Sequence, residues 1–146
     1  MNGDILPTDH TGLQVLDTES CLERVRRTPV GRIAFELDGE IAVLPVVHTV
    51  DGLDICFRTA GNAKLEMALE HDRVAYEVDQ WDPDSHSGWS VLVQGTASIV
   101  DDEDEVRRLE QVSGGSWIPQ HRQGYRWVRV RAHTITGRLL EPPADG

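Results

Sequence analysis

The sequence contains few cysteines and no histidine motif, and each shortage excludes a class of site. Cys21 and Cys56 are the two cysteines among 146 residues. They share no spacing signature, so we expect reduced packing residues rather than a disulfide framework or a metal site. The six histidines form no H-x-x-x-H or H-x-H pair, and no metal site is predicted from them.

Long apolar runs are also absent from the sequence. None approaches the roughly 20 residues that a membrane span needs. The N-terminus lacks the charged-then-apolar pattern of a secretory signal. Together with reduced cysteines, these absences predict a cytoplasmic protein with no membrane partner.

Basic residues are outnumbered: 14 Lys and Arg stand against 25 Asp and Glu, for a net charge of −11. This balance argues against a nucleic-acid partner, whose phosphates require a basic face, but it allows a small local phosphate pocket. The length suits one domain with its own core. We expect a flexible N-terminal arm over 1–16, a single domain over 17–140 and a C-terminal tail over 141–146.

Alternating apolar residues and turn signals predict a mainly β fold with short helices. Asp38-Gly39 and Asp51-Gly52 predict hairpin turns, because Asp and Gly tolerate positive φ. Pro45 predicts a bulge, bend or unpaired position, and Gly95 a bulge or bend. Helices are expected near 17–27, 63–70 and 101–111, and strands at 30–37, 40–50, 53–58, 73–79, 89–100 and 126–131, with 134–140 extended beyond a turn. Six antiparallel strands with Gly and Pro at the bends favour a small barrel over an open sheet.

One strand-to-helix break carries the residues best suited to chemistry. Strand 53–58 ends near Gly61 and is followed at once by a helix. A helix N-terminus with free backbone N–H groups, a nearby hydroxyl and two cations is suited to holding a phosphate. The chain places Arg58, Thr59, Asn62 and Lys64 there. The plainer alternative is a turn with Arg58 and Lys64 solvated on the surface.

The order and spacing of several short segments resemble a known family. The matching segments are Val30-Gly-Arg-Ile-Ala-Phe, Asp38-Gly39 before the Pro45 strand, Phe57-Arg-Thr leading to Lys64-Leu65, Gly88-Trp-Ser-Val-Leu-Val-Gln-Gly, and Val128-Arg-Val with Ile135-Thr-Gly-Arg. Over roughly residues 17–140 the chain resembles the pyridoxamine 5′-phosphate oxidase-like family of FMN-binding split β-barrels, and in particular its small actinobacterial-type members.

The resemblance implies a six-stranded antiparallel split β-barrel that forms a homodimer, with two flavin sites in clefts between the subunits. The family commonly has Thr or Ser before the lysine, where this chain has Ala63, so the amide of Asn62 would have to replace that hydroxyl toward the phosphate. The resemblance assigns the phosphate and ribityl contacts to Arg58, Thr59 and Lys64, the flavin face to Leu44, Pro45, Val46 and Val47, the ring contacts to Trp89 and Ser90, and partner-subunit contacts to Trp117 and Arg138.

Each of the outlying residues has a plainer interpretation. Trp89 can cap the end of the barrel as a strand-end aromatic, and Ser90 can simply alternate outward. Trp117 can close the dimer without touching a cofactor. Arg138 can pair with one of the 25 acidic residues.

Two functions follow from these residues. The first is an FMN-dependent oxidoreductase, with a deazaflavin as the other possible cofactor, acting on a small unsaturated or aromatic molecule. The second is a non-enzymatic flavin- or ligand-binding split barrel, suggested by Ala63 and by the lack of a catalytic acid. His48 and His86 are proton donors by type alone, and a solvated or structural role suits each better.

Overall fold

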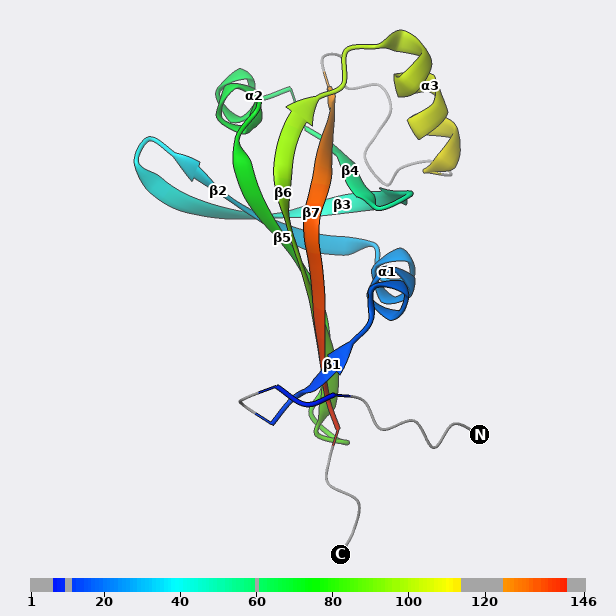
Figure 1. Cartoon of the computed structure of the whole chain (residues 1–146). Helices are drawn as coiled ribbons and strands as arrows, with labels where there is room; N and C mark the ends of the chain where they lie inside the picture. The colour runs from blue at the N-terminus through cyan, green and yellow to red at the C-terminus, as the bar shows by residue number, and fades with distance from the viewer. Residues whose placement is uncertain (1–6, 10–11, 60, 114–124, 142–146) are drawn as a thin grey trace, which may run out of the picture.

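Seven strands and three helices make up the described part of the chain, which covers residues 7–9, 12–59, 61–113 and 125–141 of a computed structural model (Figure 1). The elements in chain order are β1 (Gln14–Leu16), α1 (Thr18–Arg27), β2 (Val30–Leu37), β3 (Glu40–Asp51), β4 (Asp54–Arg58), α2 (Ala63–Leu69), β5 (Arg73–Asp82), β6 (Ser87–Ile99), α3 (Glu103–Val112) and β7 (Trp127–Leu140).

Six of the strands close into a ring, which confirms the predicted antiparallel barrel. The order around the ring is β7-β4-β3-β2-β5-β6, and β6 pairs with β7 to complete it. The ring is split because β7 changes partner on one edge: its first residues pair with β4, and Gly137–Leu139 pair with β1. The hairpin predicted at Asp38-Gly39 is present, and the second hairpin turns one residue later than predicted, at Gly52 and Leu53, because Asp51 pairs with Asp54.

Strand β1 corrects the predicted N-terminal arm. Gln14–Leu16 pair with β7, and the Leu16 side chain is buried in the main core. The last three residues of the segment predicted as an arm therefore belong to the fold. A three-residue strand is too short for a period-2 pattern to reveal it in the sequence.

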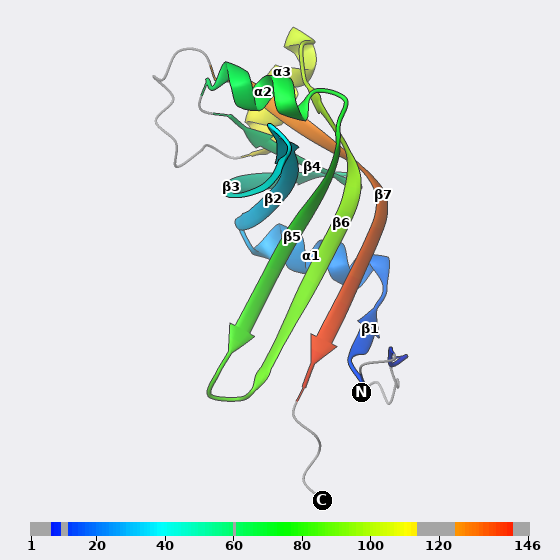
Figure 2. The same ribbon diagram turned by 90° about the vertical axis from the view of Figure 1, so that its left-hand side faces the viewer.

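The β5–β6 hairpin is longer than the sequence suggested. The sequence predicted strands at 73–79 and 89–100, but β5 continues to Asp82 and β6 begins at Ser87. Trp81 pairs directly with Gly88, where a Cβ would lie 2.6 Å from the indole ring. The glycine therefore leaves room for the tryptophan. Figure 2 shows these long strands extending well beyond the rest of the barrel.

The two predicted irregularities differ in kind. The β6–β7 register shifts between Gln94 and Gly95, so a bulge does occur there, and β7 runs through it as one strand instead of turning after Arg131. Pro45 lies in a continuous β2–β3 register opposite Arg32. On its other side the β3–β4 ladder covers only His48–Asp51, which leaves Pro45 on an unpaired edge, as a residue without an N–H requires.

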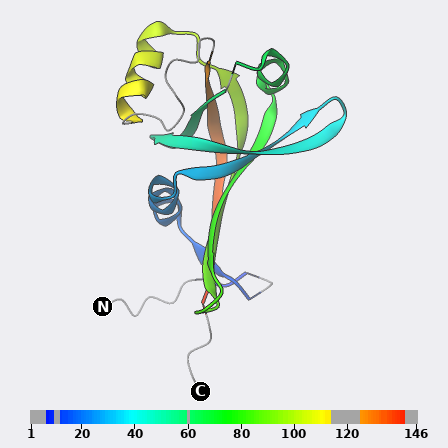
Figure 3. The same cartoon turned by 180° about the vertical axis from the view of Figure 1, so that it is seen from behind.

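Helix α1 begins at a side-chain cap and covers one face of the barrel (Figure 2). Asp17 is the N-cap, because its Oδ1 accepts the Ser20 N–H at 2.8 Å. Cys21, Leu22 and Val25 are buried beneath the helix. Seen from behind, the β2–β3 hairpin projects on the side of α2, away from α1 and α3 (Figure 3).

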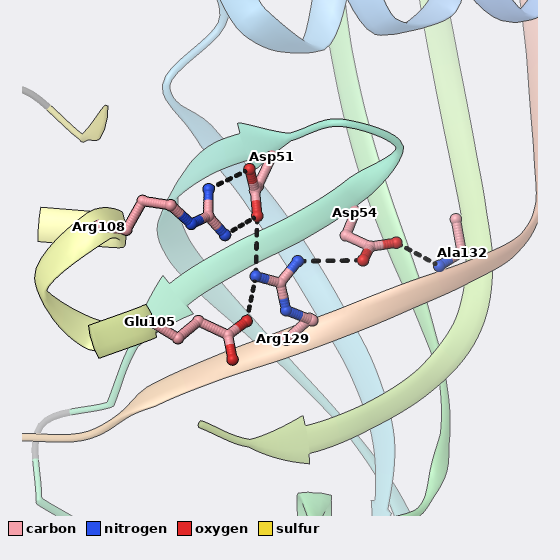
Figure 4. Close-up of polar contacts among 6 residues, drawn as sticks. All are labelled: Asp51, Asp54, Glu105, Arg108, Arg129 and Ala132. Atoms are coloured by element: carbon pink, nitrogen blue, oxygen red, sulfur yellow. Dashed lines mark hydrogen bonds and ion pairs between the residues drawn. The ribbon is translucent and has the colours of Figure 1, made fainter. Parts of the chain in front are cut away.

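An ion-pair network ties α3 to the barrel (Figure 4). The Arg129 guanidinium on β7 donates to Asp54 at 3.0 Å, to Asp51 at 2.8 Å and to Glu105 of α3. Arg108 of α3 donates two further bonds to Asp51, at 2.8 and 2.7 Å. Hydrogen bonding to Arg108, with Arg129 adding to it, holds the pKa of the Asp51 carboxyl well below its usual range despite partial burial. The network therefore stabilises the charged form of Asp51 and joins α3 to β3, β4 and β7.

His48 and Tyr76 form a polar pair inside the core, which gives His48 the structural role. Nε2 of His48 lies 2.9 Å from the carbonyl oxygen of Val25. A carbonyl only accepts, so Nε2 carries the proton and Nδ1 accepts from the Tyr76 hydroxyl. Burial lowers the pKa of His48, because the imidazolium would lose its hydration.

Acid is therefore expected to destabilise the protein through His48. The pKa of the unfolded histidine is about 6.5, and the folded value is lower. The unfolded state then binds more protons as the pH falls below about 6.5, and the free energy of unfolding decreases. Urea unfolding between pH 7.5 and 5 should show a weaker pH dependence for His48→Gln than for the wild type. The exposed His71→Asn is the control, and equal slopes for wild type and His48→Gln would contradict the assignment.

Candidate functional site

The strongest candidate site is a groove of about 340 Å³ beside β3, here called the β3 groove. Most of its walls are apolar. It brings together six residues that the sequence nominated from two separate segments: Leu44, Pro45, Val46, Val47, Arg58 and Thr59. The full lining is Val30, Leu44, Pro45, Val46, Val47, Phe57, Arg58, Thr59 and Leu65.

Arg58 is buried at the edge of this groove instead of lying in solvent. Its side chain is 9% exposed, and the guanidinium carbon lies 5.0 Å from the Tyr125 ring centroid and 5.1 Å from that of Trp127. Two aromatic faces thus hold one positive charge, each by a cation–π contact. The surface-cation alternative does not hold for Arg58.

Thr59 is fixed between β7 and α2. Its backbone N–H donates to the Arg126 carbonyl at 2.8 Å, and its hydroxyl donates to Oε1 of Glu66 at 3.1 Å. A carboxylate therefore lies beside the hydroxyl that the sequence assigned to a phosphate. Glu66 was not named from the sequence. Its position in the first turn of the helix that follows Thr59 was the signal that could have identified it.

The start of α2 differs from the sequence expectation of free backbone N–H groups. The side chain of Asn62 accepts from Lys64 N at 3.1 Å and from Leu65 N at 3.2 Å, as an N-cap. The Lys64 ammonium lies 2.6 Å from Oδ2 of Asp38, on the β2–β3 turn, and both side chains are mostly exposed. Two of the N–H groups expected to be free, those of Lys64 and Leu65, therefore have a partner in Asn62. The contact expected between the side-chain NH2 group of Asn62 and a phosphate stays a prediction.

Ser90 and Arg138 lie together in a different cavity. They are paired across β6 and β7, and both line a hollow of about 240 Å³ that also includes Trp81. None of its lining residues lines the β3 groove. Arg138 donates from Nε to Oδ2 of Asp9 at 2.7 Å, which realises the ion pair considered for it. Within one chain, the predicted residues thus form two separate groups.

Trp89 also lines the hollow that contains Ser90 and Arg138. It precedes Ser90 on β6, so its side chain lies on the opposite face of the strand, where it is half-buried against the main core. This position fits its interpretation as an aromatic that packs at the end of the barrel. Trp117 lies outside the described residues.

The hollow of about 240 Å³ that contains Ser90 and Arg138 is called the Ser90 hollow here. A pair of carboxyl groups that was not named from the sequence also lines it. Glu77 and Asp79 alternate on β5, and Arg32 Nη1 lies 3.1 Å from an oxygen of each. Burial, together with the neighbouring Asp79, raises the pKa of Glu77 to about 7, against the opposing effect of Arg32. Glu77 can therefore hold a proton near neutral pH. In the sequence, Glu77 and Asp79 are two residues apart on one strand, which places both carboxyl groups on the same face; this was the signal that could have identified the pair.

Other kinds of site have no support in the described residues. There, no set of three or more His, Cys, Asp and Glu side chains is arranged to hold a metal ion. No described helix combines the length and apolar character needed to cross a membrane. Both cysteines are free and buried, and burial raises the pKa of the Cys56 thiol to about 12, which leaves it unreactive.

The closed six-strand ring, divided by a long β7 that exchanges β4 for β1, defines the chain as a split β-barrel. A family model described as pyridoxamine 5′-phosphate oxidase matches residues 17–139. The chain therefore belongs to the pyridoxamine 5′-phosphate oxidase-like family, as the sequence resemblance indicated.

Individual relatives agree with this assignment. The uncharacterized protein Rv0080 of Mycobacterium tuberculosis is 32% identical over 132 residues, which cover 87% of this chain and 78% of that protein. The structure of the FAD binding protein from Mycobacterium smegmatis has a TM-score of 0.74 at 30% identity, covering 88% of this chain and 100% of the other. A FAD-binding protein from Mesorhizobium loti has a TM-score of 0.73 at 20% identity, covering 88% and 99%, and shows the shared fold.

Proposed function

We propose that the chain binds a flavin in the β3 groove and serves as a flavin-dependent oxidoreductase for a small molecule. The observation that carries the proposal is the joint lining of this groove by Pro45, Val46, Arg58 and Thr59. The residues present fit the group, because the apolar walls suit an aromatic ring system while Arg58 and Thr59 supply a cation and a hydroxyl.

FMN is the cofactor proposed from the sequence resemblance, and a deazaflavin and FAD are its competitors. FAD enters because the 30% identical protein from Mycobacterium smegmatis is described as FAD binding. All three carry a fused ring and at least one phosphate group, so the β3 groove and its nearby cations suit them equally. The choice among the three cofactors depends on residues outside the β3 groove, which would contact the parts in which the cofactors differ.

A homodimer is part of the proposal. Ile41 and Val43 are more than half exposed on β3, and Leu44 joins them at the groove. Such a strip is typical of an interaction surface. A two-fold dimer would cover it on both subunits and would bring the Ser90 and Arg138 of the partner subunit toward the groove, uniting the two groups of predicted residues.

When bound, the flavin would supply hydride or electron transfer. The protein's own part is to bind and orient it. Apolar residues of β3 would exclude water from the bound ring system, and Arg58, held between two aromatic rings, would supply positive charge for its phosphate. Glu77, with its pKa raised to about 7, is the proposed proton source on the Ser90 side. Because both cysteines are free thiols, we place this chemistry in the cytoplasm.

A non-enzymatic split barrel, a carrier of a flavin or of another ligand, is the second candidate. It is favoured by one observation: Lys64, Thr59 and the first N–H groups of α2 already have partners in Asp38, Glu66 and Asn62. A bound phosphate would have to compete with them. Steady oxidation of a reductant by the flavin-loaded protein in the presence of an acceptor would exclude the carrier.

Replacement of Lys64 by alanine is expected to weaken flavin binding by about tenfold, because a charge-assisted hydrogen bond contributes roughly 1.5–3 kcal/mol and Lys64 is partly screened. Asp38→Asn should strengthen binding severalfold by releasing Lys64. The measurement is a fluorescence titration with FMN and FAD, with exposed Arg107→Ala as a control for net charge. If the wild-type protein changes the fluorescence of neither FMN nor FAD, the proposed function is overturned.

A further inference from the structure

A third cavity of about 490 Å³ lies between the C-terminal half of α1 and the β5–β6 hairpin. We call it the α1 hollow. Figure 2 shows α1 crossing this face of the sheet behind β5 and β6. Its lining residues are Glu23, Arg24, Arg27, Thr28, Gln80 and Trp89. The volume falls within the roughly 300–1,000 Å³ of small-molecule sites.

The sheet side of the hollow combines an aromatic ring with an amide. Gln80 and Trp89 are directly paired across β5 and β6, so their side chains lie on the same face. An indole ring offers a stacking surface to any nucleic acid base. A glutamine amide both donates and accepts, which matches the N6 and N7 edge of adenine.

The helix side supplies positive charge. Arg24 and Arg27 line the hollow, whereas Arg26, between them, does not. Nη1 of Arg24 donates to the Ser20 carbonyl at 3.2 Å, and Arg27 pairs with Glu23 on the surface. A guanidinium has five N–H donors, so each arginine keeps donors for a phosphate. In a chain of net charge −11 this local basic surface is unusual.

We propose that the α1 hollow binds an adenine nucleotide group, with the base on Trp89 and Gln80 and the phosphate on Arg24 and Arg27. Trp89, which lines both the α1 hollow and the hollow beside Ser90, thereby gains a ligand-binding role in the α1 hollow. Arg27 gives up its exposed pair with Glu23 to the phosphate, and such surface pairs contribute little.

Two sources can provide this group. One is a free adenine nucleotide. The other is the adenylate half of FAD, because Thr28 lines the α1 hollow while Val30 lines the β3 groove. These residues are two positions apart, so their Cα atoms are within roughly 7 Å, and one dinucleotide can reach both cavities. This second source rests on the proposed function, whereas the first does not.

The test is a titration of the full chain with AMP at low ionic strength, followed by calorimetry. We expect saturable binding to the wild type and about tenfold weaker binding to Arg27→Gln, the change that corresponds to roughly 1.4 kcal/mol. Arg26→Gln is the matched control: it removes the same charge from the same helix outside the hollow, and it should bind as the wild type does. Trp89→Leu should also weaken binding, with its folding checked by circular dichroism.

Parallel titrations with FMN and FAD separate the two sources. Tighter binding of FAD than of FMN, with the excess lost in Arg27→Gln, assigns the hollow to the adenylate half of FAD. AMP binding that depends on Arg27 assigns the hollow to a free nucleotide if FAD and FMN bind equally well. It does so too if neither flavin binds, and that outcome contradicts the flavin proposal alone. No AMP binding to the wild type, or equal loss in Arg26→Gln and Arg27→Gln, would overturn the inference.

Discussion

Replacement of Arg129 by alanine is expected to lower the free energy of unfolding by about 3 kcal/mol, the lower end of the range for breaking a buried ion pair. The side chain of Arg129 is 13% exposed and contacts three carboxylates. Without it, Asp51, Asp54 and Glu105 would face one another with Arg108 as the remaining cation of the network (Figure 4). The lower end applies because these carboxylates retain some contact with water.

Urea unfolding at pH 7 and pH 3 tests this expectation. The pKa of Asp51 is depressed in the folded protein, so its stabilisation is present above the unfolded value of about 3.9 and is lost as the pH falls below it. The difference between wild type and Arg129→Ala should therefore shrink at pH 3. Arg107→Ala, which removes an exposed i,i+3 pair with Asp104, should change stability by less than about 0.5 kcal/mol. A similarly small effect for Arg129→Ala would show that the network does not hold α3.

Replacement of Gly95 by alanine is the second change with a large expected effect: the free energy of unfolding should fall by about 3 kcal/mol, the upper end of the usual range for overpacking. A Cβ at Gly95 would meet the backbone carbonyl of Arg131 and approach Cα of Ala132 at 3.2 Å. These are atoms of the partner strand at the β6–β7 register shift, and a backbone cannot turn away as a flexible side chain can. The strands would have to separate where the barrel closes.

Thermal unfolding of Gly95→Ala beside Ser98→Ala, on the same strand, would measure this effect. The serine variant adds no atom and should unfold near the wild-type temperature. Circular dichroism would show whether the glycine variant still folds. A Gly95→Ala protein as stable as the wild type would mean that the bulge can relax around an extra methyl group.

The hairpin turns illustrate what local sequence predicts well. Asp38-Gly39 and Asp51-Gly52 marked β2, β3 and β4, because a tight turn needs residues that tolerate positive φ. Gln14–Leu16 were missed because their strand exists through its pairing with the far end of β7. Local propensity carries no information about a partner more than 100 residues away.

The candidate site shows the same division. Arg58 and Thr59 were found from a local break, yet the two aromatic rings that hold Arg58 come from the segment before β7 and its first residue. Asn62 was predicted to reach a phosphate, and its side-chain oxygen caps the helix. Trp89 and Ser90 were assigned ring contacts by the family resemblance; both line one hollow, and Trp89 also lines the α1 hollow.

The sequence by itself determined the mainly β composition, the six barrel strands, the family and the residues that border the β3 groove, because periodicity, turn chemistry and motif order are local properties. Tertiary structure alone decided which of those residues meet. It separated Ser90 and Arg138 from the groove, buried Arg58 between two rings, paired Lys64 with Asp38 and joined α1 to Trp89. Each of these contacts depends on the closure and register of the barrel, which bring distant segments within reach of one another.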